Sequence, residues 1–439
     1  YFQASKPGPS SLLLRLLYTL LWHLAIPLIG LRLAWRARRQ PEYLQHVGER
    51  FGRYPCNMDG PLIWLHAVSV GETRASAPLV HALLDAHPEC SLLLTHMTPT
   101  GRATAAELFG GMAPRVRSVY LPYDLPWAVA RFLRHFRPRM GVLMETELWP
   151  NLVEGCRHSG IPLALVNARL SERSARGYGH AGSLARDAVA HLSAIGAQTE
   201  ADGQRLTALG ARWLQVTGNI KFDITPPDAL LALGKAFRSR IGPRPILLAA
   251  STREGEEGPL LEAFARRCPA EVLLVLVPRH PQRFDEVAGL VARSGLKQQR
   301  RSDDAATVSA DTRVLLGDSM GEMYAYYAAS DVALIGGSWE KLGGQNPIEA
   351  AAVGCPVVVG PHTFNFKAVC EQAIDAGAAL RAENLEEGVD LALDLIRTPA
   401  RRQAMGEAGQ GFARAHRGAT ARTIALLEPL LRGAPARKG

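Results

Sequence analysis

Two glutamate-bearing segments follow apolar runs of the kind that form buried parallel strands. Val68-Ser69-Val70-Gly71-Glu72 comes after the run 62–66, and Glu145-Thr146-Glu147-Leu148-Trp149-Pro150-Asn151 comes after the run 140–144. Ligands of open α/β sheets bind outside the carboxyl ends of the strands, so these carboxylates are the first candidates for chemistry. A carboxylate placed there can take the proton of an attacking hydroxyl as a general base.

The spacing around Glu72 supports two interpretations. Ser69-Val70-Gly71-Glu72 is a Ser-x-x-Glu capping box, in which the glutamate reaches back to the start of its helix. The same strand-to-helix turn aims a carboxylate at the edge of the sheet, which suits the general base. Spacing alone favours the cap and leaves both interpretations open.

Glu145 and Glu147 flank Thr146, and an extended chain would point both carboxylates to one side. We predict that one of them binds hydroxyls of the acceptor substrate or supports Glu72, and we favour Glu145 as the functional residue. The alternative is an ordinary acidic residue favoured by the dipole of the next helix. Trp149 and Pro150 are expected to begin that helix and to wall the pocket.

Two further polar positions in the first half suit an anion. Arg169 follows the run 163–167, and its guanidinium can hold a lipid phosphate or a sugar carboxylate; the alternative is a solvated ion pair with Glu172 or Glu200. Thr98 opens a helix whose free amides can hold an anion, although an unoccupied helix cap is the commoner outcome.

The second half carries a succession of strand-end loops that suit a nucleotide. Ser251 to Gly255 is predicted to open a helix after the run 246–250, where amides and hydroxyls suit a phosphate; a capping box from Ser251 to Glu254 is the alternative. Arg279 and His280 end the next strand. The remaining predicted donor-binding residues are Gly317, Met320, Gly321, Glu322, Gly337, Asn346 and Glu349.

Asn346 and Glu349 are three positions apart, so on a helix after Gly344 they share a face near its N-terminus. A surface cap followed by a solvated acid is the alternative. His66 and His96 end strands, but without clustered aspartates or cysteines the sequence disfavours a metal site. We therefore predict no metal and no cofactor.

Composition narrows the classes of partner. The 439 residues carry a net charge of +9, which favours anionic partners, while only 7% are aromatic. With no zinc-type cysteine spacing and no arginine-rich recognition segment, nucleic acid ranks last. The six cysteines are scattered singly, which is typical of reduced thiols in a cytosolic body.

A stretch of mostly apolar residues near the N-terminus predicts a membrane anchor. It runs from Leu12 to Leu31, long enough to cross a hydrocarbon core of about 30 Å, but Arg15 and Pro27 weaken that interpretation. A helix in the membrane interface, or one packed on the body, stays open. Arginines after the stretch place the body on the cytoplasmic side of the inner membrane.

Short apolar runs alternate with helical patterns along the rest of the chain, which predicts βαβ units and parallel sheets. We expect an α/β protein of two Rossmann-like domains facing a cleft, the glycosyltransferase B fold, with an N-terminal anchoring helix. The predicted divisions are a tag remnant at 1–5, the anchor helix at 10–40, an acceptor-binding domain at 41–217, a nucleotide-sugar-binding domain at 218–410, and a final helix at 411–439, whose own pattern does not decide whether it packs back on the first domain.

Both glutamate segments, with Gly336-Gly337-Ser338 and Gly343-Gly344-Gln345-Asn346-Pro347-Ile348-Glu349, resemble the family of 3-deoxy-D-manno-octulosonic acid (Kdo) transferases of lipopolysaccharide synthesis. The resemblance covers nearly the whole chain after the apolar stretch. It implies transfer of Kdo from CMP-Kdo to a lipid A precursor, with Glu72 as the essential acid and Glu349 on the ribose hydroxyls. Gln345 stands where the family more often has histidine.

Two other functions stay open from the sequence. One is a membrane-associated glycosyltransferase of the same fold that uses a UDP-sugar. The other is a non-catalytic, nucleotide-sensing membrane protein that retains the fold. Donor competition by CMP or UDP separates the first from a Kdo transferase, and substitution of Glu72 separates the second.

Overall fold

The computed structural model describes residues 9–38, 40–180 and 182–433 and divides the chain into two compact units. The first unit comprises Tyr1–Ile224 and Arg417–Gly439, and the second comprises Thr225–His416. The tag remnant predicted at 1–5 lies outside the described residues. The division falls later than 217 because the segment after the last strand of the first unit stays with it: Ile220 is fully buried in that unit's core.

The first unit is built on a seven-stranded parallel sheet in the order β3-β2-β1-β4-β5-β6-β7. Its strands are β1 Leu62–His66, β2 Ser91–His96, β3 Val116–Tyr120, β4 Met140–Met144, β5 Leu163–Ala168, β6 Ala194–Ala197 and β7 Leu214–Val216. The strand order reverses between β1 and β4, which pair in parallel. Ligands of doubly wound sheets bind at such a switch point.

Helices cover both faces of this sheet, so its strands are apolar on both sides. Along β1, Leu62 and Trp64 enter one core cluster, while Ile63 and Leu65 enter another. The helices are α1 Pro9–Ala37, α2 Val70–Ala75, α3 Ala77–Ala86, α4 Pro99–Phe109, α5 Pro126–Phe136, α6 Pro150–His158, α7 Glu172–His180, α8 Gly182–Ala190, α9 Glu200–Ala208 and α18 Ala419–Gly433, with short 3₁₀ turns η1 Pro41–Leu44, η2 Glu49–Phe51, η3 Gly110–Met112 and η4 Ile220–Asp223.

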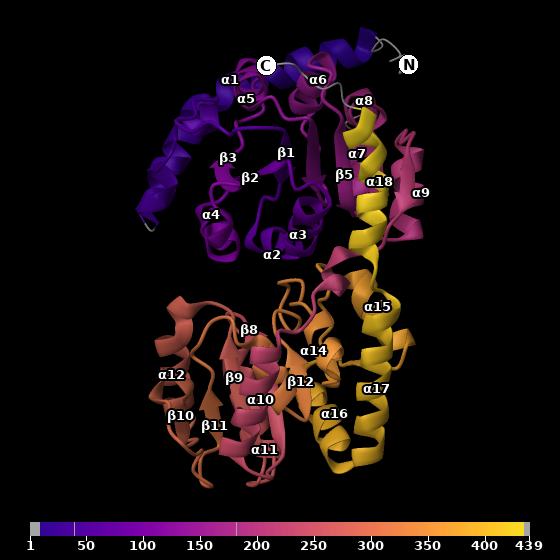
Figure 1. Cartoon of the computed structure of the whole chain (residues 1–439). Coiled ribbons are helices and arrows are strands. Elements are labelled where there is room, and N and C mark those ends of the chain that lie inside the picture. Colours follow the sequence, from indigo (N-terminus) through magenta and orange to yellow (C-terminus); the bar gives the residue numbers. More distant parts are fainter. Residues whose placement is uncertain (1–8, 39, 181, 434–439) are drawn as a thin grey trace. The chain divides into compact units, whose positions relative to one another are not determined.

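The last helix, α18, belongs to the first unit although it ends the chain. Leu427 and Leu431 enter the same core cluster as Ile63 of β1. The Asp223 carboxylate of η4 accepts the N–H groups of Gly418 (2.6 Å) and Thr420 (2.5 Å), which holds the start of the helix. Figure 1 shows this helix in yellow among the magenta elements of the first unit.

The second unit repeats the architecture with a seven-stranded parallel sheet in the order β10-β11-β9-β8-β12-β13-β14. Its strands are β8 Ile246–Thr252, β9 Leu273–Pro278, β10 Gln298–Arg300, β11 Val314–Leu316, β12 Val332–Ile335, β13 Val357–Val359 and β14 Ala379–Arg381. The switch point lies between β8 and β12, which pair in parallel. The two edge strands, β10 and β14, are absent from the predicted runs because they are short and carry polar residues.

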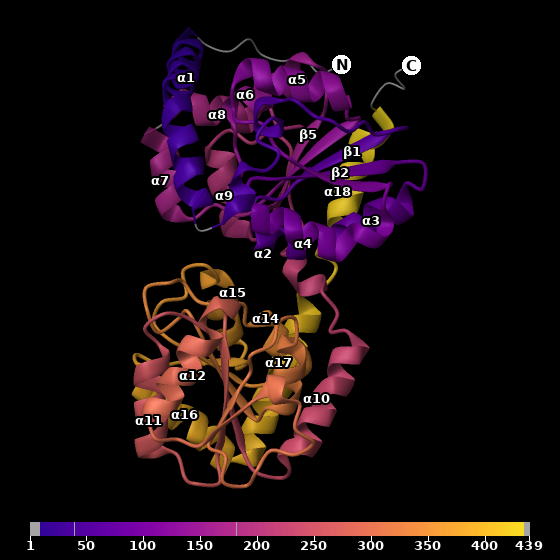
Figure 2. The ribbon, with the colours of Figure 1, turned by 90° about the vertical axis from the view of Figure 1, so that its left-hand side faces the viewer.

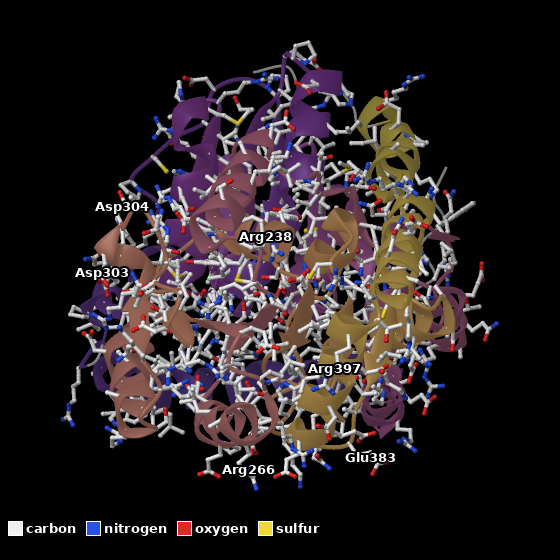
Figure 3. The ribbon with its side chains drawn as sticks, turned by 90° about the horizontal axis from the view of Figure 1, so that it is seen from below. Arg238, Arg266, Asp303, Asp304, Glu383 and Arg397 are labelled. Carbon is white, nitrogen blue, oxygen red and sulfur yellow. The ribbon has the colours of Figure 1, made fainter. Side chains whose placement is uncertain are left out.

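The helices of the second unit are α10 Asp228–Ile241, α11 Glu257–Arg267, α12 Phe284–Arg293, α13 Met323–Ala329, α14 Ile348–Val353, α15 Lys367–Asp375, α16 Leu385–Arg397 and α17 Pro399–Ala415, and its 3₁₀ turns are η5 Pro281–Arg283 and η6 Arg301–Asp303. Polar contacts join these helices to the sheet and to one another. Arg238 of α10 donates to the carboxylate of Asp331 (3.1 Å), just before β12, and Arg266 of α11 donates to Glu386 of α16 (2.5 Å). Arg238 and Arg266 are labelled in Figure 3.

Within the described ranges, α1 contains the one segment long and apolar enough to cross a membrane by length and composition, Leu12–Ala37, with a mean hydropathy of 1.8. The helix runs beside α8 and α6, as both views of the ribbon show (Figures 1 and 2). It therefore contacts the first unit as well as presenting an apolar surface.

Candidate active site

Glu72 lies at the first turn of α2, at the carboxyl end of β1. Its Oε1 accepts from Ser69 Oγ (2.9 Å) and its Oε2 accepts from the Val68 N–H (2.8 Å), while Ser69 Oγ accepts from the Glu72 N–H (3.3 Å). The serine half of the capping box that the sequence offered as an alternative is therefore formed, whereas the glutamate reaches back to the N–H of Val68 and not to that of Ser69. These bonds hold the carboxylate at the switch point of the sheet without using all its lone pairs.

Glu145 follows β4, the neighbour of β1, and is held by a lysine. Its Oε1 lies 2.7 Å from Lys221 Nζ, and both side chains are mostly buried. The backbone of Glu145 is left-handed, with φ of +60°, and its N–H donates to Val166 O (3.0 Å). The extended chain predicted through Glu147 is therefore wrong, because the chain turns at Glu145 to reach α6.

Although the chain turns at Glu145, the side chain of Glu147 stays close enough to Glu72 and Glu145 for their charges to interact. Its Oε2 accepts from Trp149 Nε1 (2.8 Å), which ties it to the residue before α6. Burial raises the pKa of Glu147, and the charge of Glu145 acts in the same direction. Pro150 begins α6 as predicted, and Trp149 is the residue directly before it.

The three carboxylates act on one another electrostatically. Burial raises the pKa of Glu72 to about 7, and the negative charges of Glu145 and Glu147 add to the rise against the hydrogen bonds from Val68 and Ser69. A carboxylate near that pKa is partly ionised at neutral pH and more basic than a solvated glutamate. This is the condition that a general base requires.

Lys221 and Asn167 contribute to this arrangement and were missed by sequence reasoning. Asn167 is the last residue but one of β5 and has a left-handed backbone (φ of +51°); its Oδ1 accepts from the Ile220 N–H (3.1 Å), beside Lys221. Asn219 Oδ1 accepts from the Lys221 N–H (3.0 Å). The sequence signal was the turn Thr217-Gly218-Asn219, which lies at the domain boundary predicted between 217 and 218.

The other predicted residues of the first half occupy the same edge of the sheet. Thr98 caps α4, accepting from the Gly101 N–H (3.1 Å) and donating to Val68 O (3.2 Å), so it joins the loops after β2 and β1. Arg169 is half-buried directly after β5. His66 and His96 are buried, and their Nδ1 atoms bond to the carbonyl oxygens of Thr95 (3.0 Å) and Ala67 (2.8 Å).

No group of three or more His, Cys, Asp or Glu side chains in the described part of the chain has an arrangement suited to a metal ion.

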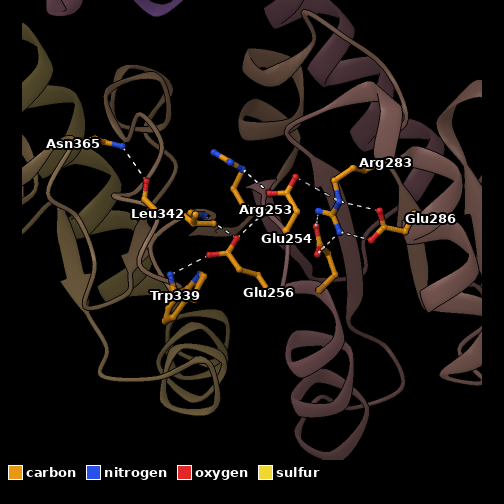
Figure 4. A network of polar contacts seen from close by, with 10 residues as sticks. Arg253, Glu254, Glu256, Arg283, Glu286, Trp339, Leu342 and Asn365 are labelled. Carbon is orange, nitrogen blue, oxygen red and sulfur yellow. Dashed lines mark hydrogen bonds and ion pairs between the residues drawn. The ribbon is translucent and has the colours of Figure 1, made fainter. Parts of the chain in front are cut away.

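Glu256 joins the two loops at the switch point of the second unit (Figure 4). Its Oε2 accepts from the N–H groups of Arg253 (2.8 Å) and Gly337 (2.8 Å), and its Oε1 accepts from the N–H of Trp339 (3.1 Å). Burial raises its pKa, while these three bonds oppose the rise. This positioning residue was missed because the spacing drew attention to Glu254.

The prediction that a helix opens at Ser251 is wrong. The strand β8 continues to Thr252 and α11 begins only at Glu257, so the capping box from Ser251 to Glu254 does not form. Ser251 has φ of +57°, and a Cβ on Gly336 would lie 2.4 Å from its carbonyl oxygen. The loops after β8 and β12 therefore approach so closely that only glycine fits at 336.

Cationic groups gather at the ends of β8 and β9. Burial lowers the pKa of His280, and the charges of Arg253 and Arg279 act in the same direction, which places all three groups near one another. The Arg279 N–H donates to Thr252 O (2.9 Å), joining the two loops. Figure 4 shows Arg253 beside Glu254 and Glu256. The cluster suits a phosphate.

The remaining predicted residues lie in loops at the same end of this sheet. Gly317 follows β11; Gly321 has φ of +80°, and Met320 is exposed. Glu322 is engaged by Arg301 (3.2 Å) and Ser319 (2.6 Å).

Gly337 and Asn346 belong to the loop between β12 and α14. Gly337 O accepts from the Gly344 N–H (2.7 Å). Asn346 lies before α14, where its Nδ2 donates to Glu349 Oε1 (3.4 Å) and its Oδ1 accepts from the Ile348 N–H (3.0 Å). The side-chain contact between Asn346 and Glu349 that the spacing indicated is therefore present.

Two doubly wound parallel units, each with polar loops at its switch point, define a protein of the glycosyltransferase B fold. Solved structures agree on the fold: a glycosyltransferase of Rickettsia africae matches with a TM-score of 0.58 at 13% identity, over 86% of this chain and 100% of that chain. The Anabaena protein HepE in complex with UDP matches with a TM-score of 0.55 at 15% identity, over 84% and 99%. A glycosyl transferases group 1 model matches residues 259–412.

The chain belongs to the 3-deoxy-D-manno-octulosonic acid transferase family. A model described as 3-deoxy-D-manno-octulosonic-acid transferase (kdotransferase) matches residues 45–224. The 3-deoxy-D-manno-octulosonic acid transferase of Bordetella pertussis is 48% identical over 94% of this chain and 99% of its own length. The enzyme of the same description from Haemophilus influenzae is 38% identical over 95% and 99%. The resemblance drawn from the motifs is confirmed.

Proposed function

We propose that this chain transfers Kdo from CMP-Kdo to a lipid A precursor, lipid IVA, at the cytoplasmic face of the inner membrane. The observation that carries the proposal is the carboxylate group at the switch point of the first unit, where burial and the charges of Glu145 and Glu147 raise the pKa of Glu72 to about 7. Such a carboxylate is basic enough to accept a hydroxyl proton in the transition state.

In the proposed step, a primary hydroxyl on the distal glucosamine of the acceptor gives its proton to Glu72. Its oxygen forms a bond to the anomeric carbon of Kdo, while the bond from that carbon to the phosphate oxygen of CMP breaks and the electron pair leaves with CMP. Glu145, held by Lys221 at 2.7 Å, is the second carboxylate, and it accepts a hydrogen bond from a hydroxyl of the acceptor sugar. Glu147 and Thr98 line the same site, and Arg169 takes a lipid phosphate.

The donor side is proposed for the switch point of the second unit. Burial lowers the pKa of His280, and the charges of Arg253 and Arg279 act in the same direction. A leaving phosphate held by these groups is stabilised as its charge develops. Glu349, paired with Asn346, is proposed to hold the ribose hydroxyls. Because guanidinium groups can neutralise the leaving CMP, the proposed reaction needs no metal ion.

The test is mass spectrometry of lipid IVA after incubation with CMP-Kdo and the detergent-solubilised protein, beside the Glu72→Gln variant. A mass gain of one or more Kdo units with wild type alone supports the acceptor, the donor and the base together. A gain in both proteins removes Glu72 as the base. No gain with a folded protein and active donor overturns the proposal and favours a UDP-sugar donor.

A further inference from the structure

One face of α1 is docked on the first unit by polar and aromatic contacts. Tyr18 Oη donates to Asp124 Oδ2 (3.0 Å), Thr19 Oγ1 donates to Asn151 Oδ1 (3.2 Å), and Arg15 forms an ion pair with Glu154 (2.9 Å). The Asp124 carboxylate is buried and also accepts the N–H groups of Asn151 and Leu152 at the start of α6. The helix is therefore bound to a buried polar network in which the Asp124 carboxylate has hydrogen-bond partners for both of its oxygens.

The docked face continues toward the C-terminal end of α1. Trp22 lies 5.8 Å from the ring of Tyr123, and Ile26 and Ile29 pack on the cluster formed by Tyr123, Leu125 and Ala128. Leu33 is only 8% exposed. From Arg15 to Leu33 the contacts recur every three or four residues, which is the period of one helix face. At about 1.5 Å per residue the docked face is about 27 Å long, which is roughly two thirds of the length of α1.

The opposite face of α1 is an exposed leucine surface. Leu13, Leu24 and Leu31 are 67%, 65% and 69% exposed. The same face also presents Leu16, Leu17, Leu20, Leu21, Leu28 and Trp35, which are all at least half exposed. A continuous apolar face of this length on a folded protein marks an interaction site.

These two faces exclude a crossing helix. A helix that spans a bilayer needs lipid or apolar protein on every side along the hydrocarbon core, but α1 keeps Arg15, Glu154 and Asp124 beside it. Charged groups in the core of a bilayer are costly. A helix with one apolar face and one polar face lies in the membrane interface instead.

We propose that α1 is a monotopic membrane helix that lies along the plane of one leaflet, with its leucine face among the acyl chains and its docked face on the first unit. The occupant of the leucine face is a lipid leaflet with anionic headgroups. Exposed arginines border this face: Arg32 on α1 itself, and Arg131 of α5, whose guanidinium stacks over Trp127 (4.9 Å). Trp127 Nε1 in turn donates to His23 of α1 (3.3 Å).

The docked face is continuous with the carboxylate site. The ring of Trp22 lies 6.0 Å from the ring of Trp149, whose Nε1 donates to Glu147 Oε2 (2.8 Å). A helix lying in the leaflet therefore holds the loop after β4 at the membrane surface, where a lipid-linked acceptor presents its sugar. This last step rests on the proposed function, whereas the placement of α1 does not.

The test is a topology measurement on the full chain with one epitope at each end, reconstituted into sealed vesicles that contain anionic lipid. Protease is added to the outside of the vesicles. Only the protein molecules whose C-terminal epitope faces outward are considered, and the loss of their N-terminal epitope is measured. A monotopic helix leaves the N-terminal epitope on the same side, so both epitopes are removed. Protection of the N-terminal epitope until detergent is added overturns the proposal. Neither outcome depends on catalytic activity.

A vesicle flotation assay tests the occupant of the leucine face. Leu20→Glu combined with Leu24→Glu changes only exposed positions, and we expect binding to anionic vesicles to fall at least about tenfold while thermal unfolding is unchanged. Trp213→Glu, an equally exposed apolar residue (60%) away from α1, is the control and is expected to bind as wild type. Equal binding of the double variant and wild type overturns the proposal.

Discussion

Lys221 Nζ and Glu145 Oε1 lie 2.7 Å apart and join the segment after β7 to the loop after β4. The ammonium compensates one of the two charges that raise the pKa of Glu72. The ion pair thus links a residue at the end of the first unit's sheet to the protonation of the proposed base at its centre.

Replacing Lys221 with methionine removes this compensation. Glu145 then repels the charge on Glu72 more strongly, so the pKa of Glu72 is expected to rise and the acidic limb of the pH–rate profile to move up by roughly half to one pH unit. Lys221→Arg keeps the charge and is the control. A profile that stays in place while the rate falls would show that Lys221 acts by structure alone.

Activity is expected to depend on pH through Glu72. The folded-state pKa of about 7 lies above the ordinary value of 4.5, so the carboxylate is protonated at acidic pH and the rate rises with pH up to about 7. In Glu72→Gln we expect kcat to fall by roughly two to four orders of magnitude, with CMP binding kept. Initial rates from pH 5 to 9 and calorimetric titration with CMP measure both.

The same pKa shift makes a prediction about stability. Between pH 4.5 and about 7 the unfolded chain releases the Glu72 proton while the folded chain retains it, so the contribution of this residue to folding stability decreases as pH rises through that window. Glu72→Gln does not titrate and is expected to lose this pH dependence. Urea unfolding at pH 5 and pH 8 tests it; parallel changes in both proteins would contradict the shift.

Glu256 is expected to be required for the donor loops of the second unit. Glu256→Ala leaves the N–H groups of Gly337 and Trp339 without their acceptor, which should cost about 2–4 kcal/mol in unfolding of this unit and weaken CMP binding. Glu254→Ala, in the same loop but 55% exposed, is the control and should stay within about 0.5 kcal/mol of wild type. Similar losses in both variants would contradict this role.

Gly336 is expected to tolerate no side chain. Gly336→Ala places a Cβ 2.4 Å from the carbonyl oxygen of Ser251, which should cost about 2 kcal/mol or more and separate the loops after β8 and β12. Gly411→Ala, inside α17 with nothing within 4 Å, should instead gain about 0.5–1 kcal/mol. Thermal unfolding compares the two variants; a neutral Gly336→Ala would show that the loops can move apart.

Sequence reasoning placed the strands that position both sites because buried parallel strands are continuous apolar runs. β1 and β4 match the predicted runs 62–66 and 140–144 residue for residue, and the loops that follow them carry the predicted glutamates. It missed β10 and β14, since Gln298–Arg300 and Ala379–Arg381 lie at sheet edges where no apolar pattern is required.

The sequence by itself determined the fold class, the family and the glutamates at strand ends, because these depend on local pattern and on motifs of a few residues. Only the tertiary structure decided which groups meet. Lys221 reaches Glu145 across 76 positions, and Glu256 reaches Gly337 across 81, because the sheet order brings distant loops to one edge. The docked face of α1 was decided the same way: its Tyr18 and Trp22 find Asp124 and Trp149 only once the first unit has folded.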